Sequence, residues 1–137
     1  MGTTIESRLL STRPELYRLI IYSNEGLTHS EAVSLNKPLA EELLKLKPSR
    51  RTMRLEKCFR SIMDSLPDGT VIKDIDVMFN PEYQIDVMKM LVEANKQKPF
   101  SVIWSGRYSD GKLIYSEESL PDYKVYEISD YDIYCVI

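Results

Sequence analysis

The feature that most constrains the fold of this chain is the alternation of short apolar runs with amphipathic segments of helical period. Apolar runs of strand length occur at 16–22, 31–36, 70–79, 100–104, 123–126 and 133–137. Between several of them lie segments whose apolar residues recur at the spacing of one helix face. Strands separated by helices predict a three-layer α/β fold with a mixed or mostly parallel central sheet.

Helices are expected at 37–46, at 50–66 and from Asn80 to Pro99. The buried stripes of the first two are expected to be Leu39, Leu43, Leu44 and Leu46, then Leu55, Phe59, Ile62, Met63 and Leu66. The third begins at Asn80-Pro81-Glu82, because Asn is a good cap and Pro suits the first helical position. A weak helix is expected at 3–13, ended by Pro14.

The stretch 106–112 has the glycine and lysine spacing of a phosphate-binding loop. Leu113 stands where that motif requires a hydroxyl for magnesium, and a strand pattern follows where it requires a helix. Asp110-Gly111 lies between two apolar runs, which is typical of a tight hairpin turn. We therefore interpret this stretch as a C-terminal β-hairpin.

Composition narrows the class of protein further. The chain has 137 residues, with 18 Lys and Arg against 21 Asp and Glu, which gives a net charge of −3. This length predicts one domain over 1–137, and no apolar run approaches the roughly 20 residues needed to span a bilayer. Two cysteines and no leader-like apolar core predict a reducing, cytoplasmic location. The single histidine, His29, cannot form a multi-histidine metal site.

The segment 23–30, after the first strong strand, is where an α/β nucleotide-binding protein would carry its phosphate loop. It has one glycine, no lysine, and an acid, Glu25, where phosphate would require positive charge. It is also shorter than the dozen residues that link neighbouring parallel strands. The strands on either side of it therefore pair as a hairpin or are not neighbours.

Asp74 and Asp76 follow an expected strand, where magnesium-binding carboxylates often lie. Without a phosphate loop we interpret them as solvent-facing residues at the strand end. No catalytic residue, metal ligand or cofactor site is predicted, and the chain is not expected to be an enzyme.

Charge is distributed unevenly along the chain. Residues 45–60 carry seven basic residues and one acid, and the candidate partner or nucleic-acid surface is Arg50, Arg51, Arg54, Lys57 and Arg60. Residues 117–137 carry six acids and one base, and the candidate acidic surface is Glu117, Glu118, Asp122 and Glu127. Such asymmetry favours head-to-tail or hetero-association, unless the two surfaces meet within one molecule. Five of nine tyrosines lie from Tyr115 onward, which suits either an interface or a core.

Short matches over roughly 16–137 resemble the small P-loop protein of type 3 BREX phage-defence systems, the BrxF family. The matching segments are 34–44, 50–66, 75–81, 86–91, 104–106, 110–115 and 120–126. The resemblance implies a RecA-like P-loop fold and, as partners, a large ATPase, a DNA methyltransferase and a phosphatase-like subunit. The family's Gly-Lys-Ser/Thr loop is missing here, and Lys73 stands at its expected metal-binding aspartate. No nucleotide-site residue is carried over.

The leading hypothesis is a non-catalytic accessory subunit that binds other components of a BREX-like defence complex. The alternatives are a nucleic-acid-binding module that uses the basic helix at 50–60, and a residual ATPase with an unconventional loop. Contact with DNA and self-association are further expectations, and no membrane partner is expected.

Overall fold

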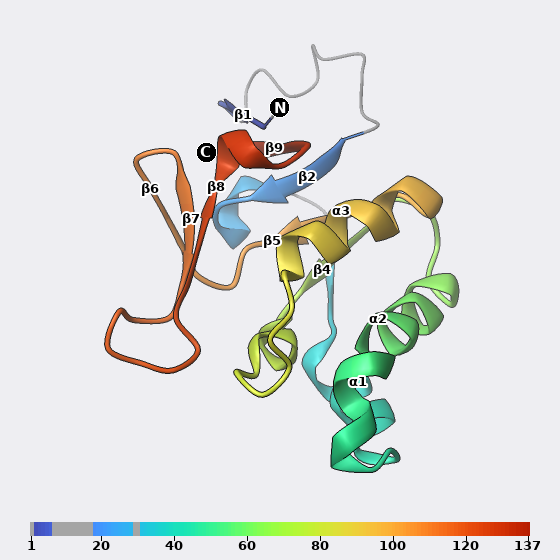
Figure 1. Cartoon of the computed structure of the whole chain (residues 1–137). Coiled ribbons are helices and arrows are strands. Elements are labelled where there is room, and N and C mark those ends of the chain that lie inside the picture. Colours follow the sequence, from blue (N-terminus) through green and yellow to red (C-terminus); the bar gives the residue numbers. More distant parts are fainter. Residues whose placement is uncertain (1, 7–17, 29–30) are drawn as a thin grey trace.

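The computed structural model describes residues 2–6, 18–28 and 31–137. Six strands form one sheet in the order β1-β9-β2-β5-β4-β3, and every neighbouring pair is parallel (Figure 1). Their bounds are β1 Thr3–Ile5, β2 Leu19–Tyr22, β3 Ala32–Ser34, β4 Thr70–Lys73, β5 Phe100–Ile103 and β9 Ile133–Val136. The prediction of an α/β fold with a mostly parallel central sheet is confirmed.

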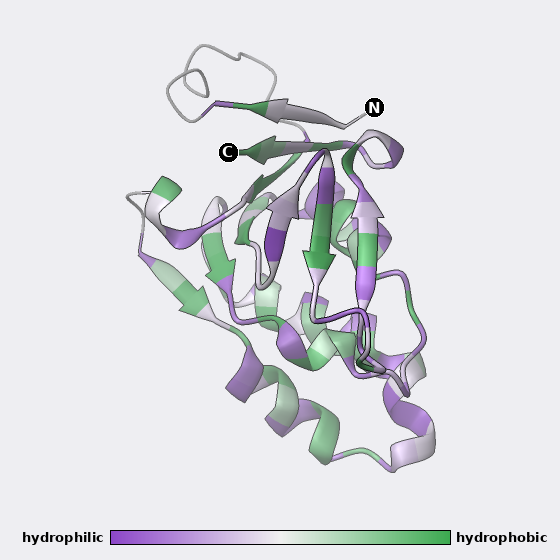
Figure 2. Cartoon of the chain, turned by 90° about the vertical axis from the view of Figure 1, so that its left-hand side faces the viewer, coloured by the Kyte–Doolittle hydropathy of each residue, from purple (hydrophilic) through white to green (hydrophobic). Residues whose placement is uncertain are grey.

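A second, antiparallel sheet has the order β6-β7-β8, with β6 Arg107–Ser109, β7 Lys112–Tyr115 and β8 Lys124–Glu127. Asp110 and Gly111 form the predicted hairpin turn between β6 and β7, with φ angles of 48° and 78°. These positive values are those of the tight turns that match strand twist. Both termini lie at one edge of the molecule, where β1 pairs with the apolar last strand (Figure 2).

The helices are α1 Asn36–Leu44, α2 Pro48–Asp64 and α3 Val87–Gln97. All three pack on one face of the parallel sheet, in a core with strand residues Leu19, Ile21, Ile72, Phe100, Val102, Ile133 and Cys135. From β3 through β4 and β5 to β9, each new strand is added in the same direction across the sheet. Crossover connections between parallel strands are right-handed. Helices of successive crossovers therefore fall on the same face.

The opposite face has a smaller apolar cluster of Tyr22, Val71, Ile103 and Val136. The step from β2 to β3 runs across the sheet in the opposite direction, so its connection belongs on this face. Its described part is a 3₁₀ turn, η2 Glu25–Leu27, and Leu27 packs against the cluster. The predicted helical layer on this side is thus not present among the described residues, because the connection is too short to form it.

Local predictions failed in four places. Thr3–Ile5 is a strand rather than a helix, and the rest of the helix expected at 3–13 lies outside the described residues, apart from Glu6. The strand expected at 70–79 ends at Lys73, because Asp74 has a φ of 53° and the chain continues as η3 Asp76–Phe79. Leu44 was expected to be buried and is 68% exposed.

The fourth failure is the helix start at Asn80. The Asn80 side chain accepts a hydrogen bond from Glu82 N, and Tyr83 N donates to Asn80 O, so these residues form a turn. Gln84 then has a φ of 47°, which no helix tolerates. The helix begins at Val87 instead, where the Asp86 carboxylate accepts from Lys89 N.

The second sheet is fixed to the first by aromatic packing. Phe79 stacks on Tyr115 with ring centroids 3.9 Å apart, and Trp104 meets Phe79 and Tyr126 edge-on. Trp104 Nε1 donates to Ile114 O at 3.0 Å. Tyr115, Tyr126 and Tyr134 are buried, so the C-terminal tyrosines serve mainly as core. This packing places β6–β8 next to the carboxyl ends of the parallel strands.

Candidate functional site

The parallel sheet has a topological switch point between β2 and β5, because the chain leaves these neighbouring strands in opposite directions. In open parallel sheets the crevice at the carboxyl ends of such strands is the usual ligand site. A pocket of about 390 Å³ lies there, lined by residues 23–25, 73, 74, 76 and 103–106. We call it the carboxyl-end pocket.

An ion pair crosses the carboxyl-end pocket. Lys73 Nζ, from the end of β4, lies 3.1 Å from Glu25 Oε1, in the turn after β2. The hydrogen bond to Glu25 raises the pKa of Lys73, so this side chain stays charged. Nucleotide sites of this topology have the opposite arrangement, with a cation in the loop and a carboxylate on the strand. Here the charges are inverted and satisfy each other.

The turn that follows β2 also uses a backbone amide in a hydrogen bond of its own. Asn24 Oδ1 accepts a hydrogen bond from Gly26 N at 3.0 Å. In a phosphate-binding loop such amides point at the ligand. In this turn, the Gly26 amide is instead used by the Asn24 side chain.

Asp76 joins three elements at the rim of the carboxyl-end pocket. Its Oδ1 accepts from Asn36 Nδ2 at 3.1 Å, and its Oδ2 accepts from the Tyr115 hydroxyl at 2.9 Å. Asn36 in turn accepts from Val77 N at 2.9 Å. Burial, followed by the bond to Asp76, raises the pKa of Tyr115, which therefore remains a hydrogen-bond donor. Asp74 and Asp76 are exposed to solvent, as expected, and both oxygens of Asp76 also accept hydrogen bonds, which the sequence did not predict.

Side chains that could bind a metal ion do not cluster within the described ranges. No group of three or more histidine, cysteine or acidic side chains there could hold an ion. His29 lies outside the described residues. No described helix is long and apolar enough to cross a bilayer.

The five basic candidates on α2 do not form one surface. Arg51 Nε donates to the carbonyl oxygens of Leu43 and Leu46, at the end of α1, where cations stabilise the helix dipole. Arg60 pairs with Glu56 at 3.0 Å. Arg50, Arg54 and Lys57 share the side of α2 that faces α1, and they form no ion pair or side-chain hydrogen bond with other described residues.

These three cations line a hollow of about 270 Å³ between α1 and α2, which we call the basic groove. The other lining residues are Glu42, Leu46, Cys58 and Ser61. Burial and the Glu42 charge raise the pKa of Cys58, while Arg54 and Lys57 act to lower it. The basic groove is therefore cationic at its rim and partly apolar inside.

The acidic candidates lie on the second sheet and its loop. Glu117, Glu118 and Asp122 belong to the loop between β7 and β8, which we call the acidic loop and define as 116–123. Asp122 accepts from Ser116 Oγ at 2.6 Å, and Glu117 lies 3.8 Å from Arg107. Glu127 is separate, on β8, and lies 3.8 Å from Lys112.

The two charged regions lie on opposite sides of the molecule: α1 and α2 on one side, and β6, β7 and β8 on the other (Figure 1). They therefore do not neutralise each other within one chain, which resolves the alternative that the sequence left open.

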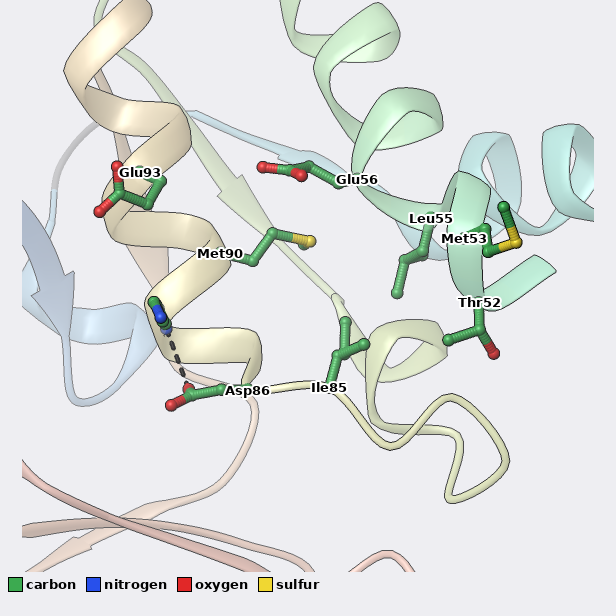
Figure 3. A pocket seen from close by; sticks show the side chains of 9 residues that line it. Thr52, Met53, Leu55, Glu56, Ile85, Asp86, Met90 and Glu93 are labelled. Carbon is green, nitrogen blue, oxygen red and sulfur yellow. Dashed lines mark hydrogen bonds between the residues drawn. The ribbon is translucent and has the colours of Figure 1, made fainter. Parts of the chain in front are cut away.

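A further groove of about 430 Å³ lies between α2 and α3, with Met53, Ile85 and Met90 beside the acids Glu56 and Glu93 (Figure 3). Met53 is 81% exposed. This groove was not anticipated from the sequence, because its two walls come from helices far apart in the chain.

Comparisons with known proteins add no relatives: no protein-family model, curated protein or solved structure matches this chain. Two contacts were not predicted from the sequence: the ion pair of Glu25 with Lys73 and the hydrogen bond of Tyr115 to Asp76. The available signal for the first pairing was an acid in the turn after one strand and a lysine at the end of another strand.

Proposed function

We propose that this chain is a non-catalytic interaction subunit, built on a RecA-like P-loop sheet, that binds other components of a BREX-like anti-phage defence complex. The observation that carries the proposal is the ion pair between Glu25 and Lys73. It occupies the place at the switch point where a nucleotide-binding relative would hold phosphate and metal. A fold that keeps this architecture but closes the site with its own charges is suited to binding rather than phosphate chemistry.

The strand order supports a P-loop-like ancestry. From β2 onward the order is β9-β2-β5-β4-β3. In RecA-like P-loop sheets the loop-bearing strand is likewise central, the next strand lies at the far edge, and the following two return towards the centre. In the described part of the segment that would form the phosphate loop and its helix, the helical structure is the 3₁₀ turn η2.

Binding of partners is supported by the cations of the basic groove, which have no partner in the described part of the chain, and by the acids of the opposite side. The test is co-purification of the tagged full chain with the large ATPase, methyltransferase and phosphatase-like proteins of a BREX-like system. We expect capture of at least one of them, weakened when Arg50, Arg54 and Lys57 are changed to Glu or when Glu117 and Glu118 are changed to Lys. Lys96→Glu, on α3, is the matched control. Absence of capture under low salt would contradict the proposal.

A second candidate function is nucleic-acid binding through the basic groove. It is favoured by one observation, the three cations of α2 that face the same side without partners among the described residues. Such binding would weaken steeply with salt, since each phosphate contact releases counterions. Fluorescence anisotropy with a labelled DNA duplex tests it: binding lost in the Arg50, Arg54 and Lys57 to Glu variant would support it, and unchanged or absent binding would remove it.

A further inference from the structure

We propose that copies of this chain associate head to tail, with the acidic loop of one copy seated in the basic groove of the next. The inference rests on the proposal that these two charged regions are interaction surfaces, and it names a second copy of this chain as the occupant. The observations that carry it are shape, charge and position, and each is independent of the others.

The basic groove is a receptor for an acidic, partly apolar protrusion. Arg50, Arg54 and Lys57 lie along its rim, and Leu46 and Cys58 contribute its apolar lining. Its volume of about 270 Å³ is enough for one aliphatic side chain and the groups beside it. Because these cations form no ion pair with other residues that the structure describes, they can meet carboxylates without first breaking such a pair.

The acidic loop has the complementary character. Leu120 is 49% exposed, and Glu117, Glu118 and Asp122 surround it in sequence. The loop is held by its own hydrogen bonds, from Leu120 N to Glu117 O at 2.9 Å and from Tyr123 N to Leu120 O at 3.2 Å. Arg107 Nη1 also donates to Ser116 O at 3.1 Å. A loop ordered in this way loses little conformational freedom on binding.

The position of the two surfaces decides the kind of assembly. They lie on opposite sides of one molecule (Figure 1), so a chain cannot fill its own groove. Contact between two different surfaces is heterologous, and it yields a ring or an open filament rather than a closed two-fold dimer. The expected species therefore grow with concentration beyond two copies.

Sedimentation velocity on the full chain tests the inference. At about 50 mM salt we expect species larger than the 15.9 kDa monomer that increase with concentration, and at about 500 mM salt we expect the monomer, because salt screens exposed charges. A monomer at low salt, at concentrations up to about 1 mM, would overturn the inference.

Two charge-reversed variants show which surfaces meet. The groove variant carries Arg54→Glu and Lys57→Glu, and the loop variant carries Glu117→Lys and Glu118→Lys. Each alone is expected to stay monomeric at low salt, and an equimolar mixture is expected to associate again, because each reversed surface finds an opposite charge on the other variant. Lys89→Glu with Lys96→Glu, on α3, should associate like the unchanged chain.

A mixture of the two variants that stays monomeric, while both retain the native circular dichroism spectrum, would contradict the contact. Association that persists in either variant alone would do the same. A monomeric chain whose binding to a DNA duplex is lost in the groove variant would assign the basic groove to nucleic acid instead.

The rate of Cys58 alkylation gives a second readout, because this thiol lines the basic groove. At low salt we expect labelling of the unchanged chain to slow about fivefold or more as its concentration rises, and labelling of the groove variant to be independent of concentration. Only the concentration dependence is compared between the two, because Arg54 and Lys57 themselves lower the pKa of Cys58. Labelling that does not change with concentration would place the contact elsewhere.

Discussion

The carboxyl-end pocket and the basic groove are both lined by charged side chains, but their charges are arranged in opposite ways. In the pocket, Glu25 pairs with Lys73, and Asp76 is bonded by Asn36 and Tyr115. In the groove, the three cations of α2 have no partner among the described residues. Paired charges tie elements of the fold together, whereas unpaired charges on a surface are available to another molecule.

The charges of the carboxyl-end pocket therefore interact mainly within the fold, whereas those of the basic groove are exposed to binding partners. Substitutions in the carboxyl-end pocket are therefore expected to change stability, and substitutions in the basic groove are expected to change binding.

The largest expected contrast is between the two thiols. Cys135 is fully buried in β9, and burial raises its pKa to about 12, whereas Cys58 is half-buried in the groove. Labelling of Cys135 requires global opening, so a thiol reagent should modify it at least about a thousandfold more slowly than Cys58. Mass spectrometry of the timed reaction measures both rates, and comparable rates would contradict the structure.

The same burial gives a pH dependence with a definite sign. Cys135 and Tyr131 have folded pKa values of about 12, above the ordinary 9.0 and 10.0 of their groups. Unfolding therefore releases protons in this range, so the contribution of these two groups to stability is fully present below about pH 8.5 and is lost as the pH rises towards 12. Urea unfolding at a series of pH values tests this, and stability that rises above pH 10 would be the wrong sign.

Gly106 forms part of the pocket wall, and a side chain there has no room. A Cβ atom would lie 1.9 Å from Ile114 O and 2.9 Å from Trp104 Nε1, so the backbone between the two sheets would have to move. Gly106→Ala is expected to destabilise by about 3 kcal/mol or more. Gly111→Ala meets no atom within 4 Å and should cost only about 1 kcal/mol for its left-handed backbone. Equal losses in urea unfolding would count against this packing.

Asp76→Ala removes the acceptor shared by Asn36 and Tyr115. We expect a loss of about 1–2 kcal/mol, moderated because Asp76 is itself exposed to solvent. Asp74→Asn, in the same pocket and tolerant of the left-handed backbone, should change stability by less than about 0.5 kcal/mol. If both variants unfold at the same urea concentration as the unchanged chain, the Asp76 bonds do not stabilise the fold.

The smallest effects on stability are expected when one charge is removed from the carboxyl-end pocket or from the basic groove. Glu25→Gln should cost no more than about 0.5 kcal/mol, since the pair with Lys73 is partly exposed, and Arg54→Ala should leave stability unchanged. A clear loss in Arg54→Ala, measured by thermal unfolding, would show that the groove cations also hold the fold.

The elements that sequence predicts well are those decided by neighbouring residues. Asp110-Gly111 fixes its turn through its own backbone preference, and Pro99 ends α3 where the periodicity stops. The strands at Leu19–Tyr22 and Phe100–Ile103 also follow from their composition, because strands buried on both faces are almost continuously apolar.

The failures come from contacts that local patterns do not contain. Asn80-Pro81-Glu82 has the residues of a helix start, yet the turn closed by Asn80 and the left-handed Gln84 delay the helix to Val87. The pair of Glu25 and Lys73 joins residues 48 positions apart, so only the strand order brings them together. Arg51 and Arg54 look equivalent in the sequence, and only the packing of α1 separates their roles.

Titration of the full chain with ATP and magnesium, followed through the backbone amide NMR signals of 23–28 and 73–76, most directly tests whether the carboxyl-end pocket is closed by its own charges. We expect no shift of these signals up to about 1 mM nucleotide, because Glu25, Lys73 and the Asn24-capped turn already satisfy one another. Saturable shifts at these amides would contradict this view and would show that the carboxyl-end pocket binds nucleotide.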